Sequence, residues 1–172
     1  MNIHNHERLS DAIQFANWAH RKQKRKLTDA PYIMHPCHGT MLLMCHGLSI
    51  DDPLEFIAII AETLHDTHED NPKEVSLPLI NETFGYDVAR VVFGVTLDPT
   101  NPDKRRARQK ILRADWIVRI VKVADILSNT ISTTSVVRKR GLAVVQKHFS
   151  QPISDRVRME RAFFEKSLPE KR

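Results

Sequence analysis

The sequence predicts an all-α protein, and two observations lead to that prediction. Only 5 of the 172 residues are glycine, which is few for an all-β or dinucleotide-binding fold because such folds use glycine at many turns. Apolar residues also recur at spacings of three and four, the pattern of a helix with one buried face. A chain of this length suits one domain, so we expect residues 1–172 to form a single helical unit.

Two helices are expected in the first quarter of the chain. The spacing of apolar residues predicts the first over residues 9–26, behind a cap formed by Ser10 or Asp11 and with a basic end. The second is predicted over residues 36–45. The proline at its start disfavours helical geometry for His35, so we expect His35 in an extended or turn conformation at a junction.

The third predicted helix opens at Asp51 or Asp52 with the proline that follows, and runs through the apolar stretch FIAIIAETLHD. Because this stretch is apolar nearly all round, we expect it in the core.

Later helices are predicted over residues 74–94, in two pieces broken near Gly85, and from about Gln151 to the end of the chain. Residues 113–130 are ambiguous, because the β-branched run IVRIV suits a strand as well as a helix. We interpret them as a helix, since ADILSNT continues at helical spacing.

Composition excludes several classes of protein. No apolar run approaches the roughly 20 residues that span a bilayer, and the first residues lack the pattern of a signal peptide, so we expect a cytoplasmic protein. Cys37 and Cys45 are the only cysteines, and we expect them as buried, reduced thiols, which excludes a thiolate zinc site. The net charge of +5 suits an anionic partner, whether nucleic acid, a membrane surface or a phosphorylated small molecule.

The stretch TLHDTHED, residues 63–70, places charge where the core helix should end. His65 and Asp66 are neighbours, and Glu69 and Asp70 lie one turn further along the same faces. Charge at the end of a core helix must be satisfied, because an unpaired buried carboxylate costs several kcal/mol. A divalent metal ion would satisfy it.

A metal ion needs more ligands than one helical pair provides, so a distant histidine and a distant carboxylate are expected. His35, in YIMHP, and Asp125, in the apolar context VKVADIL, are the candidates. Asn129 follows Asp125 by one helical turn and is expected to line the same cavity.

Four motifs in this order, AHRKQKRK, PYIMHP, TLHDTHED and VKVADILSNT, resemble those of the metal-dependent HD superfamily. They are most similar to the hydrolase domain of RelA/SpoT homologues and to stand-alone small alarmone hydrolases. The resemblance implies an all-helical HD-domain bundle with a metal site in its central cleft. It implies one Mn²⁺ ion, with another divalent metal as an alternative, held by His35, His65, Asp66 and Asp125.

The resemblance also assigns roles in catalysis and binding. It implies that Glu69 and Asp70 orient or activate the attacking water. It implies contacts with the nucleotide from Arg25, Lys26, Asn129 and Arg156.

The activity so implied is removal of the 3′-diphosphate of (p)ppGpp or (p)ppApp, giving pyrophosphate and GDP, GTP or the adenine equivalents. Functional pairing with an alarmone synthetase or a nucleotide-synthesising toxin would follow. Ile126, Ser128 and Glu160 depart from the family pattern, which favours as an alternative an HD phosphohydrolase for NADPH 2′-phosphate or a nucleoside monophosphate. The basic charge leaves a second alternative, a non-catalytic nucleotide- or nucleic-acid-binding HD module.

Overall fold

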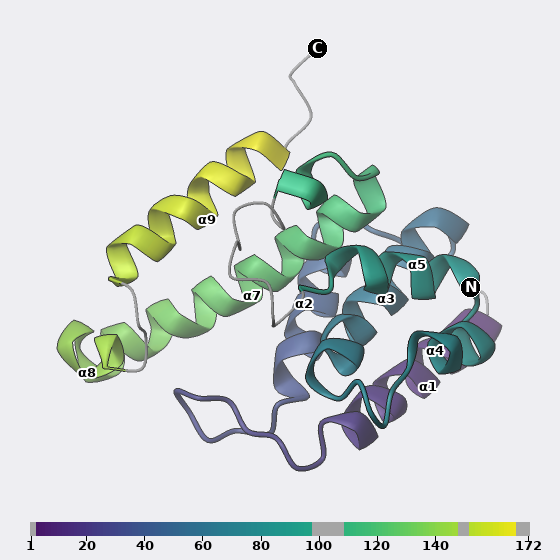
Figure 1. Ribbon diagram of the computed structural model, residues 1–172, viewed down its shortest axis with the longest axis horizontal. Coiled ribbons are helices and arrows are strands. Elements are labelled where there is room, and N and C mark those ends of the chain that lie inside the picture. The colour runs from purple at the N-terminus through teal and green to yellow at the C-terminus, as the bar shows by residue number, and fades with distance from the viewer. Residues whose placement is uncertain (1–2, 98–108, 148–151, 168–172) are drawn as a thin grey trace.

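The computed structural model describes residues 3–97, 109–147 and 152–167. In these segments the protein is helical, and its only extended pairing is an isolated antiparallel bridge between Lys24 and Pro31 (Figure 1). The predicted all-α class is confirmed. The helices are α1 (Ile3–Ala19), α2 (Met34–Cys45), α3 (Pro53–Asp70), α4 (Leu77–Phe84), α5 (Tyr86–Val95), α7 (Trp116–Arg140), α8 (Leu142–Gln146) and α9 (Ile153–Ser167).

Helix α3 lies at the centre of the molecule and packs against α1, α2, α5 and α7. As predicted, it begins behind Asp52, whose side chain accepts hydrogen bonds from the backbone N–H groups of Leu54 and Glu55, with proline at the first helical position. Its side chains Ile59, Ile60 and Leu64 are fully buried. The central position of α3 carries the charged end of this helix into the interior.

Helix α7 is the longest helix described, and it confirms the helical interpretation of IVRIV. Asp115 caps it by accepting a hydrogen bond from Val118 N at 3.0 Å. Its first half packs on α2, α3 and α5, while α8 and α9 lie against its outer side (Figure 1). Thus α7 brings the residues around Asp125 to the centre of α3.

The first helix differs from its prediction. It begins at Ile3 and ends at Ala19, so Ser10 lies inside it, and residues 20–26 lie outside it in turns and in the bridge of Lys24 with Pro31. Two tertiary contacts hold the added first turns, since Asn5 Nδ2 donates to Ile50 O at 2.6 Å and Arg8 Nη2 to Phe84 O at 3.0 Å.

The second helix also differs, because His35 is helical and not extended as expected. Helix α2 begins at Met34, and Pro36 sits in its first turn, where a missing N–H removes no intrahelical hydrogen bond. Both cysteines are free, but Cys45 is exposed and Cys37 is half-buried, so the expectation that both thiols are buried is wrong. Cys45 is the last residue of α2, where the helix meets solvent.

The remaining predictions on helices hold. Residues 74–94 contain α4 and α5, separated by Gly85, whose φ of +95° favours glycine. The last helix begins at Ile153, close to the predicted start, and buries Phe163. None of the described helices is long and apolar enough to cross a membrane.

Candidate metal centre

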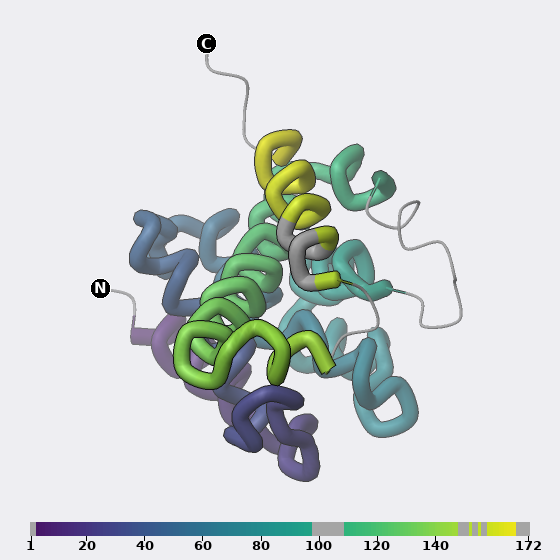
Figure 2. The backbone as a smooth tube through the Cα atoms, turned by 90° about the vertical axis from the view of Figure 1, so that its left-hand side faces the viewer, coloured from purple at the N-terminus to yellow at the C-terminus, as the bar shows by residue number. Residues whose placement is uncertain are grey.

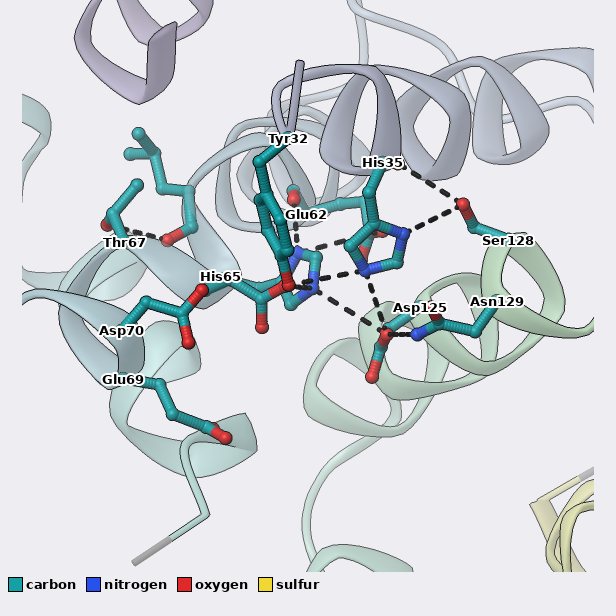
Figure 3. A network of polar contacts seen from close by, with 12 residues as sticks. Tyr32, His35, Glu62, His65, Thr67, Glu69, Asp70, Asp125, Ser128 and Asn129 are labelled. Carbon is teal, nitrogen blue, oxygen red and sulfur yellow. Dashed lines mark hydrogen bonds and ion pairs between the residues drawn. The ribbon is translucent and has the colours of Figure 1, made fainter. Parts of the chain in front are cut away.

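Three helices bring four ligand-type side chains to one point (Figure 3). His35 comes from α2, His65 and Asp66 from α3, and Asp125 from α7. Asp66 Oδ2 lies 3.0 Å from His65 Nε2 and 3.4 Å from His35 Nε2. Asp125 Oδ1 lies 3.1 Å from His35 Nε2 and 3.7 Å from His65 Nε2. His35, His65 and Asp66 thus form a group whose ligand atoms all lie within 4.8 Å of one another, and Asp125, the fourth predicted ligand, lies beside the two imidazoles but outside that group.

This geometry fits a bound divalent cation. Ligand atoms about 2.1 Å from an ion lie ~3.0 Å apart at right angles and ~3.4 Å apart at tetrahedral angles. The four distances are close to these values. The Nε2 atom of His65 is buried and, within the described part of the chain, has no hydrogen-bond partner, although Asp66 Oδ2 is near it. Two acceptor atoms that face each other in this way need a cation or a proton between them, and mixed N and O ligands suit a first-row divalent metal.

The other ring nitrogen of each histidine is held by a hydrogen-bond partner. Nδ1 of His35 lies 3.0 Å from Ser128 Oγ, and Nδ1 of His65 lies 2.7 Å from the carbonyl oxygen of Glu62. A carbonyl oxygen only accepts, so Nδ1 of His65 donates to it and Nε2 keeps its lone pair. The Ser128 hydroxyl fixes His35 in the matching orientation. These contacts aim both Nε2 atoms at the same point.

The two carboxylates are held by hydrogen-bond donors as well. The Tyr32 hydroxyl donates to Asp66 Oδ2 at 2.8 Å. Lys122 Nζ lies 2.7 Å from Asp125 Oδ2, and Asn129 Nδ2 donates to Asp125 Oδ1 at 2.7 Å. Each carboxylate therefore has a restricted rotamer, as a preorganised ligand requires.

Electrostatics keep these carboxylates ionised. Burial by itself would raise the pKa of Asp66, but the neighbouring His65 and His35 hold that pKa well below its usual range. Burial opposes ionisation of Asp125 in the same way, and Lys122 and His35 more than offset it, so its pKa is also lowered. Burial alone would lower the pKa of His65, whereas the Asp66 and Glu62 carboxyl groups raise it well above its usual range. The site is thus an anionic pocket that favours positive charge.

Glu69 and Asp70 lie one turn further along α3 (Figure 3). Glu69 Oε2 accepts a hydrogen bond from Leu97 N at 2.7 Å, and burial raises its pKa. Burial, together with the charges of Asp66 and Glu69, raises the pKa of Asp70 to about 6. A carboxyl group with this pKa exchanges protons near neutral pH, which is the property that a general base needs.

The predicted nucleotide-binding residues lie beside the cluster where they are described. Arg25 Nη2 donates to Asn129 Oδ1 at 2.8 Å, and its guanidinium carbon lies 5.5 Å from the centre of the Tyr32 ring. Lys26 is exposed at a neighbouring cavity. The side chain of Arg156 lies outside the described residues.

Sequence reasoning missed several of these contacts. Lys122 precedes Asp125 by three residues on α7, a helical spacing that could have marked it as a neighbour of a predicted ligand. Tyr32 lies in the turn before α2 and reaches Asp66, which is 34 residues away in sequence. Ser128 was identified only as a departure from a family pattern. Nothing local indicated that it would reach across to His35, which is 93 residues away in sequence.

Glu62 is a further unexpected feature of the centre. Its side chain is fully buried, and neither carboxyl oxygen has a hydrogen-bond partner among the described residues. Burial raises the pKa of this carboxyl group well above the usual range, and the neighbouring His65 opposes that rise. Its carboxyl group occupies the space beside Gly39 on α2, where a Cβ atom would fall on Oε1 and lie 2.8 Å from Cδ. Gly39 therefore makes room for Glu62 next to His65.

Comparison with known proteins gives three findings. Residues 12–147 match the HD domain family. The guanosine-3′,5′-bis(diphosphate) 3′-pyrophosphohydrolases MESH1 of Mus musculus and Danio rerio are each 37% identical to this chain over 125 residues, which is 70% of this chain and 66% of theirs. The human protein of that name is 36% identical over the same length. The matched region thus spans just under two thirds of these relatives.

A solved structure is similar as well. It belongs to work described as "A metazoan ortholog of SpoT hydrolyzes ppGpp and plays a role in starvation responses". It superposes with a TM-score of 0.66 and 25% sequence identity, and the match covers 74% of this chain and 71% of that one. The two proteins therefore share their overall helical fold.

Proposed function

This chain belongs to the HD domain family, and we propose from that premise that it is a metal-dependent hydrolase of alarmones. The substrate would be ppGpp, pppGpp or the adenine counterparts, and the products pyrophosphate and GDP, GTP or the adenine nucleotides. The observation that carries this proposal is the buried meeting of two Nε2 atoms with two carboxylates. Relatives named for this activity are 37% identical over most of the chain, which supports the same substrate class.

The ion in the proposal is Mn²⁺, bound by His35, His65, Asp66 and Asp125. When bound there, a divalent ion supplies the charge that acidifies a water molecule and neutralises phosphoryl oxygens. Such binding needs ionised carboxylates, which the lowered pKa values of Asp66 and Asp125 favour, and neutral imidazoles, so the ion would take the place of the proton that the carboxyl groups favour on His65.

Glu69 and Asp70 handle the proton in this scheme. The oxygen of water bonds to the phosphorus nearest the ribose and the bond from that phosphorus to the 3′ oxygen breaks. The proton of water passes to a carboxylate, and the leaving 3′ oxygen takes up a proton to become the 3′ hydroxyl of the product. Asp70, with its raised pKa, suits this task. Glu69 accepts a hydrogen bond from the Leu97 N–H group, which restricts its orientation, and in the proposal it positions the water.

Arg25, Lys26, Asn129 and Arg156 bind the nucleotide in the proposal. Arg25 is already held by Asn129 and lies over Tyr32, so its planar guanidinium group is preorganised to stack on a purine or to pair with phosphate. Neither of these contacts distinguishes guanine from adenine, so both bases belong in the substrate panel.

The proposal extends to the setting of the enzyme. We place it in the cytoplasm as a single domain over residues 1–172, acting against an alarmone synthetase or a nucleotide-synthesising toxin. Such a partner makes the molecule that this chain would consume, and the anionic substrate matches the net charge of +5.

Product identification tests the proposed function. The purified protein with Mn²⁺ is incubated with ppGpp, pppGpp and ppApp, and the products are separated by anion-exchange chromatography. Release of pyrophosphate supports the proposal. Release of orthophosphate alone, or no turnover of any alarmone, overturns it. NADPH in the same panel tests the alternative hypothesis of a phosphohydrolase that removes the 2′-phosphate of NADPH.

Two variants separate metal binding from proton transfer. Asp66→Ala should lose the ion and the activity together, because it removes a ligand. Glu69→Ala should lose activity and retain the ion, as measured by metal analysis of the purified protein. His6→Ala, which changes an exposed histidine on α1, is the matched control and should alter neither.

A further inference from the structure

His20 is a buried residue near the metal centre that has no part in the mechanism above. It follows the last residue of α1 and is 2% exposed. Its ring packs against the Tyr32 ring, with 4.7 Å between the centroids, and its Nδ1 atom lies 4.0 Å from Asp70 Oδ2. The connection from α1 to α2, drawn in dark blue in Figure 2, thus brings a buried imidazole to the proposed base.

The one proton of this imidazole is on Nδ1. Burial lowers the pKa of His20, so the ring is neutral and carries a single N–H group. Nδ1 contacts the side-chain oxygen of Gln23, which can only accept a hydrogen bond. Nε2 is buried and, among the described residues, has no hydrogen-bond partner. The N–H group of His20 is therefore donated to Gln23.

Gln23 is held in place by its own backbone. Its N–H group donates to the carbonyl oxygen of His20 at 2.9 Å, and its carbonyl oxygen accepts a hydrogen bond from Tyr32 N at 3.1 Å. Because both backbone groups are engaged, the turn presents the side chain of Gln23 to the imidazole from a defined position.

Asp70 is a second possible acceptor for the same N–H group. Its Oδ2 atom, at 4.0 Å from Nδ1, lies beyond hydrogen-bond distance, and no donor in the described part of the chain is hydrogen-bonded to this carboxylate. A hydrogen bond to an ionised carboxylate is stronger than one to a neutral amide. Asp70 would therefore attract the N–H group of His20 if Gln23 did not hold it.

A hydrogen bond from His20 to Asp70 would interfere with the proposed reaction. It would occupy an oxygen lone pair of Asp70 and turn the carboxylate toward the imidazole. That lone pair is the one that has to receive the proton of water. The amide of Gln23 thus has a role that depends on the imidazole beside it.

We propose that Gln23 and His20 are positioning residues, and that Gln23 keeps Asp70 available to water by binding the only N–H group of His20. This inference rests on the proposed function, in which Asp70 is the base. It has an unusual consequence. Loss of the Gln23 amide should impair the reaction more than loss of the His20 imidazole, because the imidazole without its acceptor is what blocks Asp70.

Three variants test this order of effects in single-turnover kinetics with ppGpp and saturating Mn²⁺, which isolate the chemical step. Gln23→Leu removes the acceptor and should lower the rate constant roughly tenfold, the low end for a hydrogen bond to a charged group. His20→Phe keeps a ring against Tyr32 but has no N–H group, so its rate constant should equal that of the wild type.

The double variant Gln23→Leu with His20→Phe gives the sharpest result. It should regain the wild-type rate constant, because no N–H group remains to reach Asp70. The Kd for Mn²⁺ and the ppGpp concentration at half-maximal rate should not change in any variant, since no metal ligand is altered. Gln14→Leu, the same substitution at an exposed position on α1, is the matched control and should leave the rate constant unchanged.

Two results would overturn the inference. One is an unchanged rate constant in Gln23→Leu, and the other is a double variant as slow as Gln23→Leu, which a purely structural role of Gln23 would produce. If Gln23→Leu does not fold, His20→Phe decides, because a tenfold fall in its rate constant contradicts the inference. If the wild type hydrolyses ppGpp and these results fail, only this inference is wrong. If the wild type hydrolyses no alarmone, the proposed function is wrong as well.

Discussion

The close approach of Glu62 to Gly39 leads to a quantitative prediction about stability. In Gly39→Ala the new Cβ atom would fall on Glu62 Oε1 and lie 2.8 Å from Cδ and 3.2 Å from Cγ, closer than packed atoms tolerate. The Glu62 side chain is fully buried between α2 and α3 and has no open space into which to move. Glu62→Ala removes the carboxyl group and should make the same glycine replaceable.

The magnitude follows from two opposing contributions. Overpacking a core costs about 1–3 kcal/mol, and this contact belongs at the upper end of that range. Alanine gains about 1 kcal/mol over glycine inside a helix. Gly39→Ala should therefore cost about 2 kcal/mol in the wild type and stabilise Glu62→Ala by about 1 kcal/mol. The coupling between the two sites is then about 3 kcal/mol.

Thermal unfolding of the four proteins of this double-mutant cycle measures the coupling. For a chain of this size, Tm shifts about 2–4 °C per kcal/mol, so Gly39→Ala should lower Tm by about 4–8 °C in the wild type and raise it by about 2–4 °C in the Glu62→Ala background. Gly94→Ala is the control, because its Cβ would meet Val118 and not Glu62. Equal effects of Gly39→Ala in both backgrounds would refute the packing argument.

Three further predictions concern the metal centre. Ser128→Ala should weaken Mn²⁺ binding at least tenfold, because His35 loses the contact that orients it; competition with a chelator measures this, and unchanged affinity would contradict it. Burial and neighbouring charges raise the pKa of Asp70 to about 6, and Asp70 acts as a base only when deprotonated. At saturating Mn²⁺, kcat/KM should therefore fall tenfold per pH unit below an apparent pKa of 6 or less, because a bound cation lowers the pKa of Asp70. A pH profile in which kcat/KM already falls from an apparent pKa above 7 would exclude this role. Mn²⁺ at 100 times its Kd should stabilise the protein by about 2.7 kcal/mol, which is measured as a rise in Tm that EDTA reverses. The Asp66→Ala variant should show no such rise in Tm. If its Tm rises equally, the ion binds elsewhere.

The fold could be predicted from the sequence to the extent that it depends on local patterns. The helical class, the start of α3 at Asp52, the break at Gly85 and the helix around Asp125 all follow from caps, glycine and spacing of three and four. The errors lie where long-range contacts override local preference. The start of α1 is held by contacts of Asn5 with Ile50 and of Arg8 with Phe84, which no local pattern reveals.

The candidate site divides in the same way. The sequence by itself determined which side chains could bind an ion, because HDTHED sets two pairs one turn apart and the apolar surroundings of Asp125 demand a partner for its charge. Tertiary structure alone decided how those side chains are held. The contact of Ser128 with His35 and the packing of Glu62 against Gly39 join residues of different helices. Such contacts depend on how the helix faces pack in three dimensions. The cavity beside Lys26 has the same origin, since only packing brings Leu27 and Arg140 together.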